Sequence, residues 1–145
     1  MANLLDLTGN QPSRSLTDGE ILISQGEHGG DLYILEKGRL TIERDAVSLA
    51  TVTIPGSVVG EISVLTGTNN SATVKADGSA RVRVIRDAAK VLETEPLLTL
   101  RLAALVASRL EATSSELVAL SREMSSKNER NVLARLASAL HLTRD

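Results

Sequence analysis

Residues 60–74 are the stretch of this chain whose residue types and spacing best fit a binding site. They read Gly-Glu-Ile-Ser-Val-Leu-Thr-Gly-Thr-Asn-Asn-Ser-Ala-Thr-Val. A short helical turn over residues 61–65, entered from Gly60, directs unpaired backbone N–H groups toward an anion. Glu61, at the same positive helix end, repels a bare phosphate unless the ligand also brings a hydroxyl for the carboxylate to accept. The pattern therefore favours a sugar phosphate.

The same residues also have structural interpretations. Glu61 can simply complement the helix dipole, and Ser71 and Thr73 can be ordinary strand residues. His28 lies in a glycine-rich turn, where a solvated loop residue is expected. His141 near the end of the chain has the same interpretation.

Composition bounds the possible functions. The 145 residues suit one domain with an appendage, and Tyr33 is the only aromatic residue, so the core must be aliphatic. The chain has no Cys and only two His, far apart in sequence, which argues against a metalloenzyme and leaves no enzyme class favoured. The start lacks a signal-peptide pattern and no stretch approaches a membrane span, so we expect a cytoplasmic protein with no membrane partner.

The charge is divided unevenly along the chain. Residues 1–95 have a net charge of −4 and residues 96–145 a net charge of +2. Neither part has the basic excess expected of a DNA-binding surface. The basic run of Arg81, Arg83 and Arg86 is more typical of a solvated, edge-like strand than of a phosphate site.

From residue 16 to 86, glycine-rich turns separate short β-type segments, several of which alternate apolar and polar residues. We expect strands over residues 20–25, 31–37, 39–44, 48–54, 71–76 and 81–85. Many short strands with such turns predict a sandwich or jelly roll. Residues 1–16 are expected to be a lead-in with at most a turn of helix and no chemistry.

Beyond Asp87 the pattern becomes helical. Asp87 can cap a short helix over residues 88–93, and Pro96 suits the first turn of a long helix over 97–124. A heptad-like apolar seam runs along that helix through Leu102, Val106, Leu110, Thr113, Leu117, Leu120 and Met124. A second stripe, Leu98, Leu105 and Ala112, lies beside it. Two stripes need two partners, which we expect to be the β-domain and the same helix of a second subunit.

A last helix is expected over residues 127–142, with Ser126 and Glu129 as its capping box. The predicted organisation is therefore a β-domain over residues 1–95, a dimerisation helix over 96–125 and a terminal helix over 126–145.

The Gly-Glu-aliphatic start, the short turn and the Ser-Ala-Thr-Val strand resemble the phosphate-binding cassette of the cyclic-nucleotide-binding domain family. The resemblance implies an α+β fold, with a β jelly roll followed by a long C-terminal dimerisation helix and a shorter terminal helix. In that family the Glu accepts from the ribose 2′-OH, an Arg pairs with the cyclic phosphate, and the following Ser or Thr helps to hold it. Glu61 and Ser71 match, but Asn70 stands at the position of the Arg. One lost charge-assisted hydrogen bond, roughly 1.5–3 kcal/mol, should weaken binding about tenfold to a hundredfold.

The segment Arg109-Leu-Glu-Ala-Thr-Ser114 resembles the dimer helix of the cyclic AMP receptor protein family (Crp/Fnr-type regulators), in which a Thr-Ser pair reaches the adenine. Residues 131–142 resemble the helix that opens the DNA-binding domain there, but too few residues follow for a helix-turn-helix, so we expect no DNA binding by this chain alone. The ligand positions implied by the resemblance are Gly60, Glu61, Ile62, Asn70, Ser71, Ala72, Thr73, Thr113 and Ser114.

Two functions remain open at this point. The first is a regulatory sensor domain that binds cAMP or cGMP weakly, as a non-covalent ligand, and signals through the joint near Ser125 as a homodimer. The second is a degenerate dimerisation or protein-interaction module of the same fold that has lost its ligand.

Overall fold

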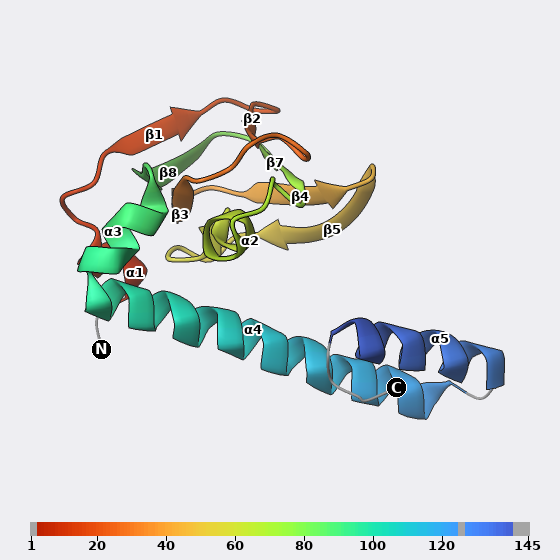
Figure 1. Cartoon of the computed structure of the whole chain (residues 1–145). Coiled ribbons are helices and arrows are strands. Elements are labelled where there is room, and N and C mark those ends of the chain that lie inside the picture. The colour runs from red at the N-terminus through yellow and green to blue at the C-terminus, as the bar shows by residue number, and fades with distance from the viewer. Residues whose placement is uncertain (1–2, 125–126, 141–145) are drawn as a thin grey trace. The chain divides into compact units, whose positions relative to one another are not determined.

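The computed structural model describes residues 3–124 and 127–140, which form two compact units, Met1–Arg101 and Leu102–Asp145. In the described residues the first unit contains two four-stranded antiparallel sheets (Figure 1). One sheet has the strand order β1-β8-β3-β6 and the other β2-β7-β4-β5. The strands are β1 (Ser13–Leu16), β2 (Ile21–Ile23), β3 (Leu32–Lys37), β4 (Leu40–Arg44), β5 (Val47–Val52), β6 (Val58–Val59), β7 (Thr73–Ala76) and β8 (Ala80–Ile85). The predicted jelly-roll-like α+β class is confirmed.

The helices of the structure are α1 (Leu4–Leu7), α2 (Glu61–Thr66), α3 (Ala88–Thr94), α4 (Pro96–Glu123) and α5 (Lys127–Ala139). Pro96 is the first residue of α4, as expected for a residue that needs no hydrogen-bonding N–H there. The predicted capping residue Ser126, the joint at Ser125 and residue 142, the predicted end of the last helix, lie outside the described residues, whereas α5 ends at Ala139. No described helix is both long and apolar enough to cross a membrane.

Strands β1 and β6 were missed because the sequence offers little signal for either. Strand β1 contains one apolar residue, Leu16, which is buried, and its backbone pairs with β8. Strand β6 is two residues long and is held by pairing with β3. Both are strands because of the neighbours they pair with and not because of their own pattern.

Pairing with β1 also corrects the interpretation of the arginine run. Strand β8 lies between β1 and β3 and is not an edge strand. The side chain of Arg83 is only 19% exposed and forms an ion pair with Glu36. Arg81 and Arg86, in contrast, are exposed.

The core lies between the two sheets. Strand β3 directs Tyr33 and Leu35 toward this core, while Leu32 and Ile34 are fully buried on the opposite face. Helix α1 contacts β3. Burial on both faces explains why residues 32–35 of β3 form a continuous apolar run, whereas a half-exposed strand would alternate apolar and polar residues.

Asp87 precedes α3 as predicted, but its side chain makes no capping hydrogen bond. Its backbone is left-handed, with φ 49°, and its carboxylate lies 3.3 Å from the Lys90 ammonium group. The backbone N–H of Asp87 donates to Asp31 Oδ1 at 3.0 Å, so the residue is oriented from outside the helix. The prediction that the Asp87 side chain caps α3 is therefore wrong, although the helix begins at Ala88 as expected.

Candidate functional site

The predicted cassette turn is present. Helix α2 begins at Glu61, directly after Gly60, whose φ of 88° is left-handed. A Cβ at Gly60 would lie 2.7 Å from the Asp31 carbonyl oxygen, so only glycine fits. This close approach brings the start of α2 against the segment that connects β2 and β3.

The side chains of α2 differ in how far they are buried. Ser63 is buried, and its hydroxyl donates to the Gly60 carbonyl at 3.1 Å, which places it in the structure of the turn. Glu61 is partly exposed in the first turn, and Ile62 is 52% exposed. Glu61 therefore has the partial access to solvent that a ligand-contacting carboxylate needs.

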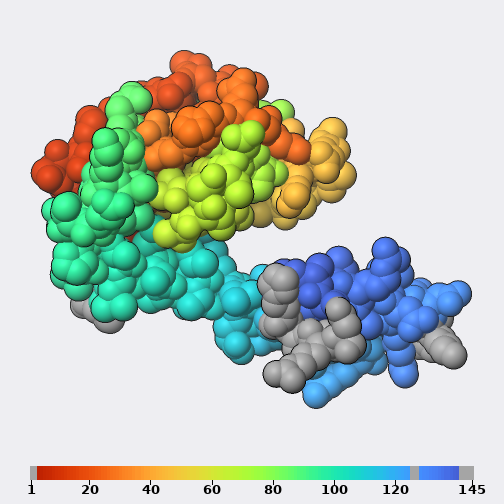
Figure 2. Space-filling view, in the orientation of Figure 1, coloured from red at the N-terminus to blue at the C-terminus, as the bar shows by residue number. Residues whose placement is uncertain are grey.

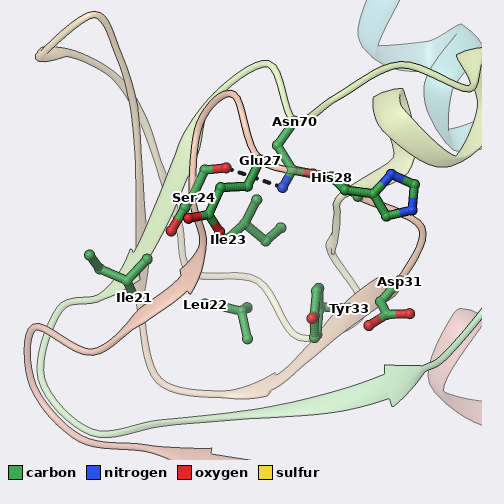
Figure 3. Close-up of a pocket in the computed structure, with 10 residues that line it drawn as sticks. Ile21, Leu22, Ile23, Ser24, Glu27, His28, Asp31, Tyr33 and Asn70 are labelled. Atoms are coloured by element: carbon green, nitrogen blue, oxygen red, sulfur yellow. Dashed lines mark hydrogen bonds between the residues drawn. The ribbon is translucent and has the colours of Figure 1, made fainter.

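Asn70 connects the cassette to the β2–β3 segment. Its N–H donates to the Glu27 carbonyl at 2.9 Å, and its own carbonyl accepts from the Gly26 N–H at 2.8 Å. Its side-chain Nδ2 donates to the Ser24 carbonyl at 3.1 Å, the bond dashed in Figure 3. Asn70 was expected only as the residue that replaces an arginine, whereas in the structure its side-chain amide links the cassette to the β2–β3 segment.

Gly29, in the β2–β3 segment, also lies close to the cassette. A Cβ built there would lie 2.6 Å from Asn70 Oδ1 and would also clash with Ser63. The glycine pair in the sequence allows this approach, although its pattern alone did not indicate which residues it faces.

A pocket of about 260 Å³ opens beside this junction (Figure 3). It is lined by Ile21, Leu22, Ile23, Ser24, Glu27, His28, Gly29, Asp31, Tyr33 and Asn70. Of the predicted ligand positions only Asn70 lines it. The other lining residues were not predicted as site residues; for those of the loop, the glycine-rich turn over residues 26–30 is the available sequence signal. His28 is exposed, as expected, and is part of the lining.

The charged groups of the lining are mainly acidic. Glu27 and Asp31 contribute carboxylates, and no Lys or Arg is among the lining residues. Asp31 forms a long ion pair with Arg86, with 3.7 Å between Nη1 and Oδ2. Burial raises the pKa of the Tyr33 phenol, and the nearby Asp31 charge raises that pKa further, so the phenol remains a protonated donor at neutral pH.

The end of the cassette is bonded to the segment that follows β2. The Gln25 N–H donates to Thr73 Oγ1 at 3.0 Å, which occupies one acceptor position of that hydroxyl. Ser71 and Ala72, just before β7, are partly buried.

Thr113 and Ser114 lie in the second compact unit, on α4. Their hydroxyls donate to the Arg109 and Leu110 carbonyls, both at 2.9 Å. Such bonds to the preceding turn are common for hydroxyl residues in helices, and each oxygen can still accept.

Comparison with known proteins identifies the fold family. A family model described as "Cyclic nucleotide-binding domain" matches residues 13–91, which is more than half of the chain. The chain belongs to the cyclic nucleotide-binding domain family. The match includes all eight strands of the described structure and the whole cassette.

Solved structures agree with the family assignment. A structure described as "cAMP bound PfPKA-R (141-441)" is 28% identical with a TM-score of 0.61, and the match covers 75% of this chain and 36% of that one. This chain therefore spans about a third of that relative. The N-terminal domain of a transcriptional regulator from Streptomyces coelicolor A3(2) is 25% identical with a TM-score of 0.58, covering 76% of this chain and 83% of the other.

The catabolite activator protein of Thermus thermophilus shows the same fold. Its TM-score is 0.66 at 20% identity, with coverage of 96% of this chain and 84% of that chain. The resemblance to Crp/Fnr-type regulators is thus confirmed at the level of the fold.

Proposed function

We propose that this chain is a regulatory sensor domain that binds cAMP or cGMP with modest affinity and signals through its C-terminal helices. The observation that supports the proposal is the cassette turn, in which Glu61 begins α2 directly after the left-handed Gly60, within the matched residues 13–91. In this proposal Glu61 accepts from the ribose 2′-OH, while Ser71 and the first N–H groups of α2 hold the phosphate.

Asn70 sets the expected affinity. It offers an amide where a guanidinium would bind phosphate through two charge-assisted hydrogen bonds. Its Nδ2 is already engaged with the Ser24 carbonyl. We therefore expect micromolar or weaker binding.

Calorimetric titration with cAMP and cGMP tests the proposal. Asn70→Arg should tighten cyclic-nucleotide binding about tenfold or more, because the phosphate regains a bidentate partner. Asn69→Arg is the matched control, since it adds the same charge at an exposed neighbouring position that does not line the pocket. Absence of heat with both nucleotides, for wild type and for Asn70→Arg, would reject ligand binding in favour of the interaction module.

The ribose contact has its own test. Glu61→Ala should weaken binding of the ribonucleotide much more than that of its 2′-deoxy analogue, because only the hydroxyl gives the carboxylate a donor. Equal losses for the two ligands would show that Glu61 acts on helix α2 and not on the ligand. The part of Thr113 and Ser114 stays a prediction, which Thr113→Ala and Ser114→Ala would test with an adenine and a guanine ligand.

The second candidate function, a homodimeric interaction module, is favoured by apolar residues exposed on α4. Leu110, Val118 and Leu120 are 48%, 51% and 37% exposed. A parallel homodimer through residues 97–124 would bury Leu110, Leu117 and Leu120, at roughly 1.5–3 kcal/mol each before association costs.

Leu117→Asp should dissociate this dimer, as measured by sedimentation at tens of micromolar. Ala119→Asp, exposed and off the seam, is the control and should leave it intact. A wild-type chain that sediments as a monomer would contradict the dimer. Dimerisation without nucleotide binding would favour the module over the sensor.

A further inference from the structure

We propose that Gln25 and Asp45 are positioning residues for the candidate nucleotide site, because the contact between their side chains holds the chain around Ser71 in place. The inference rests on the proposed function, in which Ser71 is a side chain that holds the phosphate. Gln25 and Asp45 are not among the ligand positions expected from the sequence, and neither lines the pocket of Figure 3.

Asp45 begins the tight turn between β4 and β5. Strand pairing places Arg44 opposite Val47, so the loop consists of Asp45 and Ala46 alone. Both residues have positive φ, 52° and 62°, as in the type I′ turn that fits the twist of a hairpin. A β-turn uses only the N–H of its last residue internally, so the Asp45 N–H is available to an acceptor outside the turn.

The Gln25 side chain supplies that acceptor and also a donor. The Asp45 N–H donates to Gln25 Oε1 at 2.9 Å, and Gln25 Nε2 donates to Asp45 Oδ1 at 2.8 Å. A single amide group therefore bonds both the backbone and the carboxylate of Asp45. These two hydrogen bonds are called the clasp. Few non-glycine residues adopt the backbone of Asp45 and Ala46, so a contact from outside helps to hold this turn.

The clasp crosses the sheet at the point where the cassette enters β7. Strand β7 lies between β2 and β4. Its first residue, Thr73, is paired with Glu43, and the next residue is paired with Ile23. Because β2 and β4 both run antiparallel to β7, the residues that follow Ile23 and Glu43 lie beyond the start of β7. Gln25 and Asp45 are two such residues, and their side chains meet across it.

The segment after β2 also bonds the chain on both sides of Ser71. On one side, the Asn70 N–H donates to the Glu27 carbonyl at 2.9 Å. On the other side, the Gln25 N–H donates to Thr73 Oγ1 at 3.0 Å. Figure 2 shows the two segments, orange and yellow-green, side by side at the surface. Ser71 therefore lies between two points that are bonded to the same segment.

Gln25 joins the cassette to the β4–β5 turn, through its backbone N–H on one side and its side-chain amide on the other. Release of the amide frees residue 25 to shift, and Thr73 and Ser71 shift with it. Both Gln25 and Asp45 are exposed, so each bond competes with water and contributes modestly to stability. We expect the clasp to set the position of Ser71 and to matter little for global unfolding.

Exchange of the two functional groups tests the clasp. Gln25→Glu removes the Nε2 donor and places a carboxylate against that of Asp45, so it should break the contact. Asp45→Asn keeps an oxygen acceptor and the backbone N–H, so it is the matched control and should leave the clasp intact. The double variant Gln25→Glu/Asp45→Asn again pairs a carboxylate with an amide and should restore it.

Nuclear magnetic resonance of the ligand-free chain measures the effect residue by residue. In Gln25→Glu, amide hydrogen exchange should become about tenfold faster at residues 25 and 45, because each loses a hydrogen-bonded partner or its support. The amide chemical shifts of residues 71–73 should move as well. Asp45→Asn and the double variant should resemble wild type. Val82, fully buried on β8, should keep its exchange rate in every variant, because that rate follows global unfolding.

Calorimetry with cAMP measures the consequence for the ligand. The affinity should fall severalfold in Gln25→Glu and return in the double variant, although neither residue is a ligand position. Asp45→Asn should bind as wild type does. A residue that only stabilised the fold would change the exchange of Val82 before it changed the affinity.

The outcomes separate this inference from the proposed function. Changes at residues 25, 45 and 71–73 that the double variant reverses support the inference. Faster exchange at residue 45 with unmoved shifts at residues 71–73, faster exchange at Val82, or an unchanged cAMP affinity in Gln25→Glu would each overturn it and leave the sensor function standing. Absence of cAMP binding to wild type would reject the sensor function, and the exchange rates and shifts would still decide whether the clasp positions Ser71.

Discussion

Two acidic sites in the β-domain differ in how their charge is compensated. Glu36, on β3, accepts hydrogen bonds from the Ser13 hydroxyl at 2.7 Å and from Arg83 Nε at 2.9 Å. Arg83 Nη2 lies 2.7 Å from the same carboxylate oxygen and Arg81 Nε lies 3.0 Å from the other. In the pocket, Glu27 has no side-chain partner among the described residues, and Asp31 accepts from the Asp87 N–H at 3.0 Å and forms the long pair with Arg86.

The difference shows where the domain uses its arginines. Arg83 also donates to the Leu5 carbonyl at 2.6 Å, so a single guanidinium connects the N-terminal helix, β8 and β3. This is a structural use of a cation, whereas no Lys or Arg lines the pocket. Fold stability and ligand selection can therefore be tested separately.

The largest expected effect follows from removing Arg83. Arg83→Met should lower the free energy of unfolding by about 2–3 kcal/mol, because it leaves Glu36 mostly buried with much of its compensation lost and deprives the Leu5 carbonyl of a donor. Urea denaturation measures this loss in the free energy of unfolding. Arg81→Met, at a side chain that is 57% exposed, is the control and should cost less than about 1 kcal/mol. Equal losses for the two variants would contradict the central role of Arg83.

Acid should weaken the same cluster. Burial of Glu36 opposes its ionisation, but hydrogen bonds from Ser13 and Arg83, with the charges of Arg83 and Arg81, outweigh burial and lower its pKa. A lowered folded-state pKa contributes stability that is present above the unfolded-state pKa, about 4.3, and is lost as the pH falls through the folded-state value.

Unfolding of wild type should therefore show a loss of stability below about pH 4.3 that Glu36→Gln reduces. Ser13→Ala, which removes one of the hydrogen bonds to Glu36, should lose free energy of unfolding with falling pH by an amount between those of wild type and Glu36→Gln. Identical pH slopes for wild type and Glu36→Gln would show that the cluster does not stabilise the ionised form.

The smallest effect is expected at the pocket. Glu27→Gln should change the free energy of unfolding by less than about 0.5 kcal/mol, because the side chain is exposed and has no partner in the described residues. The same urea titrations measure it. A loss above about 1 kcal/mol would mean that Glu27 is structural, and the contrast between the two acidic sites would fail.

Local patterns were sufficient for much of the fold. Alternation around Leu40 and Ile42 predicted β4, and the change of period after Asp87 predicted α3 and α4. The cassette turn after Gly60 was also predictable, because a glycine followed by residues that readily begin a helix is a local signal. Strands β1 and β6 were not predictable, since pairing with distant neighbours makes them strands.

By itself the sequence determined the period of each long element, the positions of the turns and the presence of Asn70 where the family has an arginine. Only the tertiary structure decided what Asn70 and Arg83 do, because their partners Ser24 and Glu36 lie 46 and 47 residues away along the chain. Such contacts depend on how the two sheets and their connecting loops come together, and no local propensity encodes that. The acidic character of the pocket has the same origin, since Glu27 and Asp31 approach the cassette only when the β2–β3 segment packs against Gly60 and Asn70.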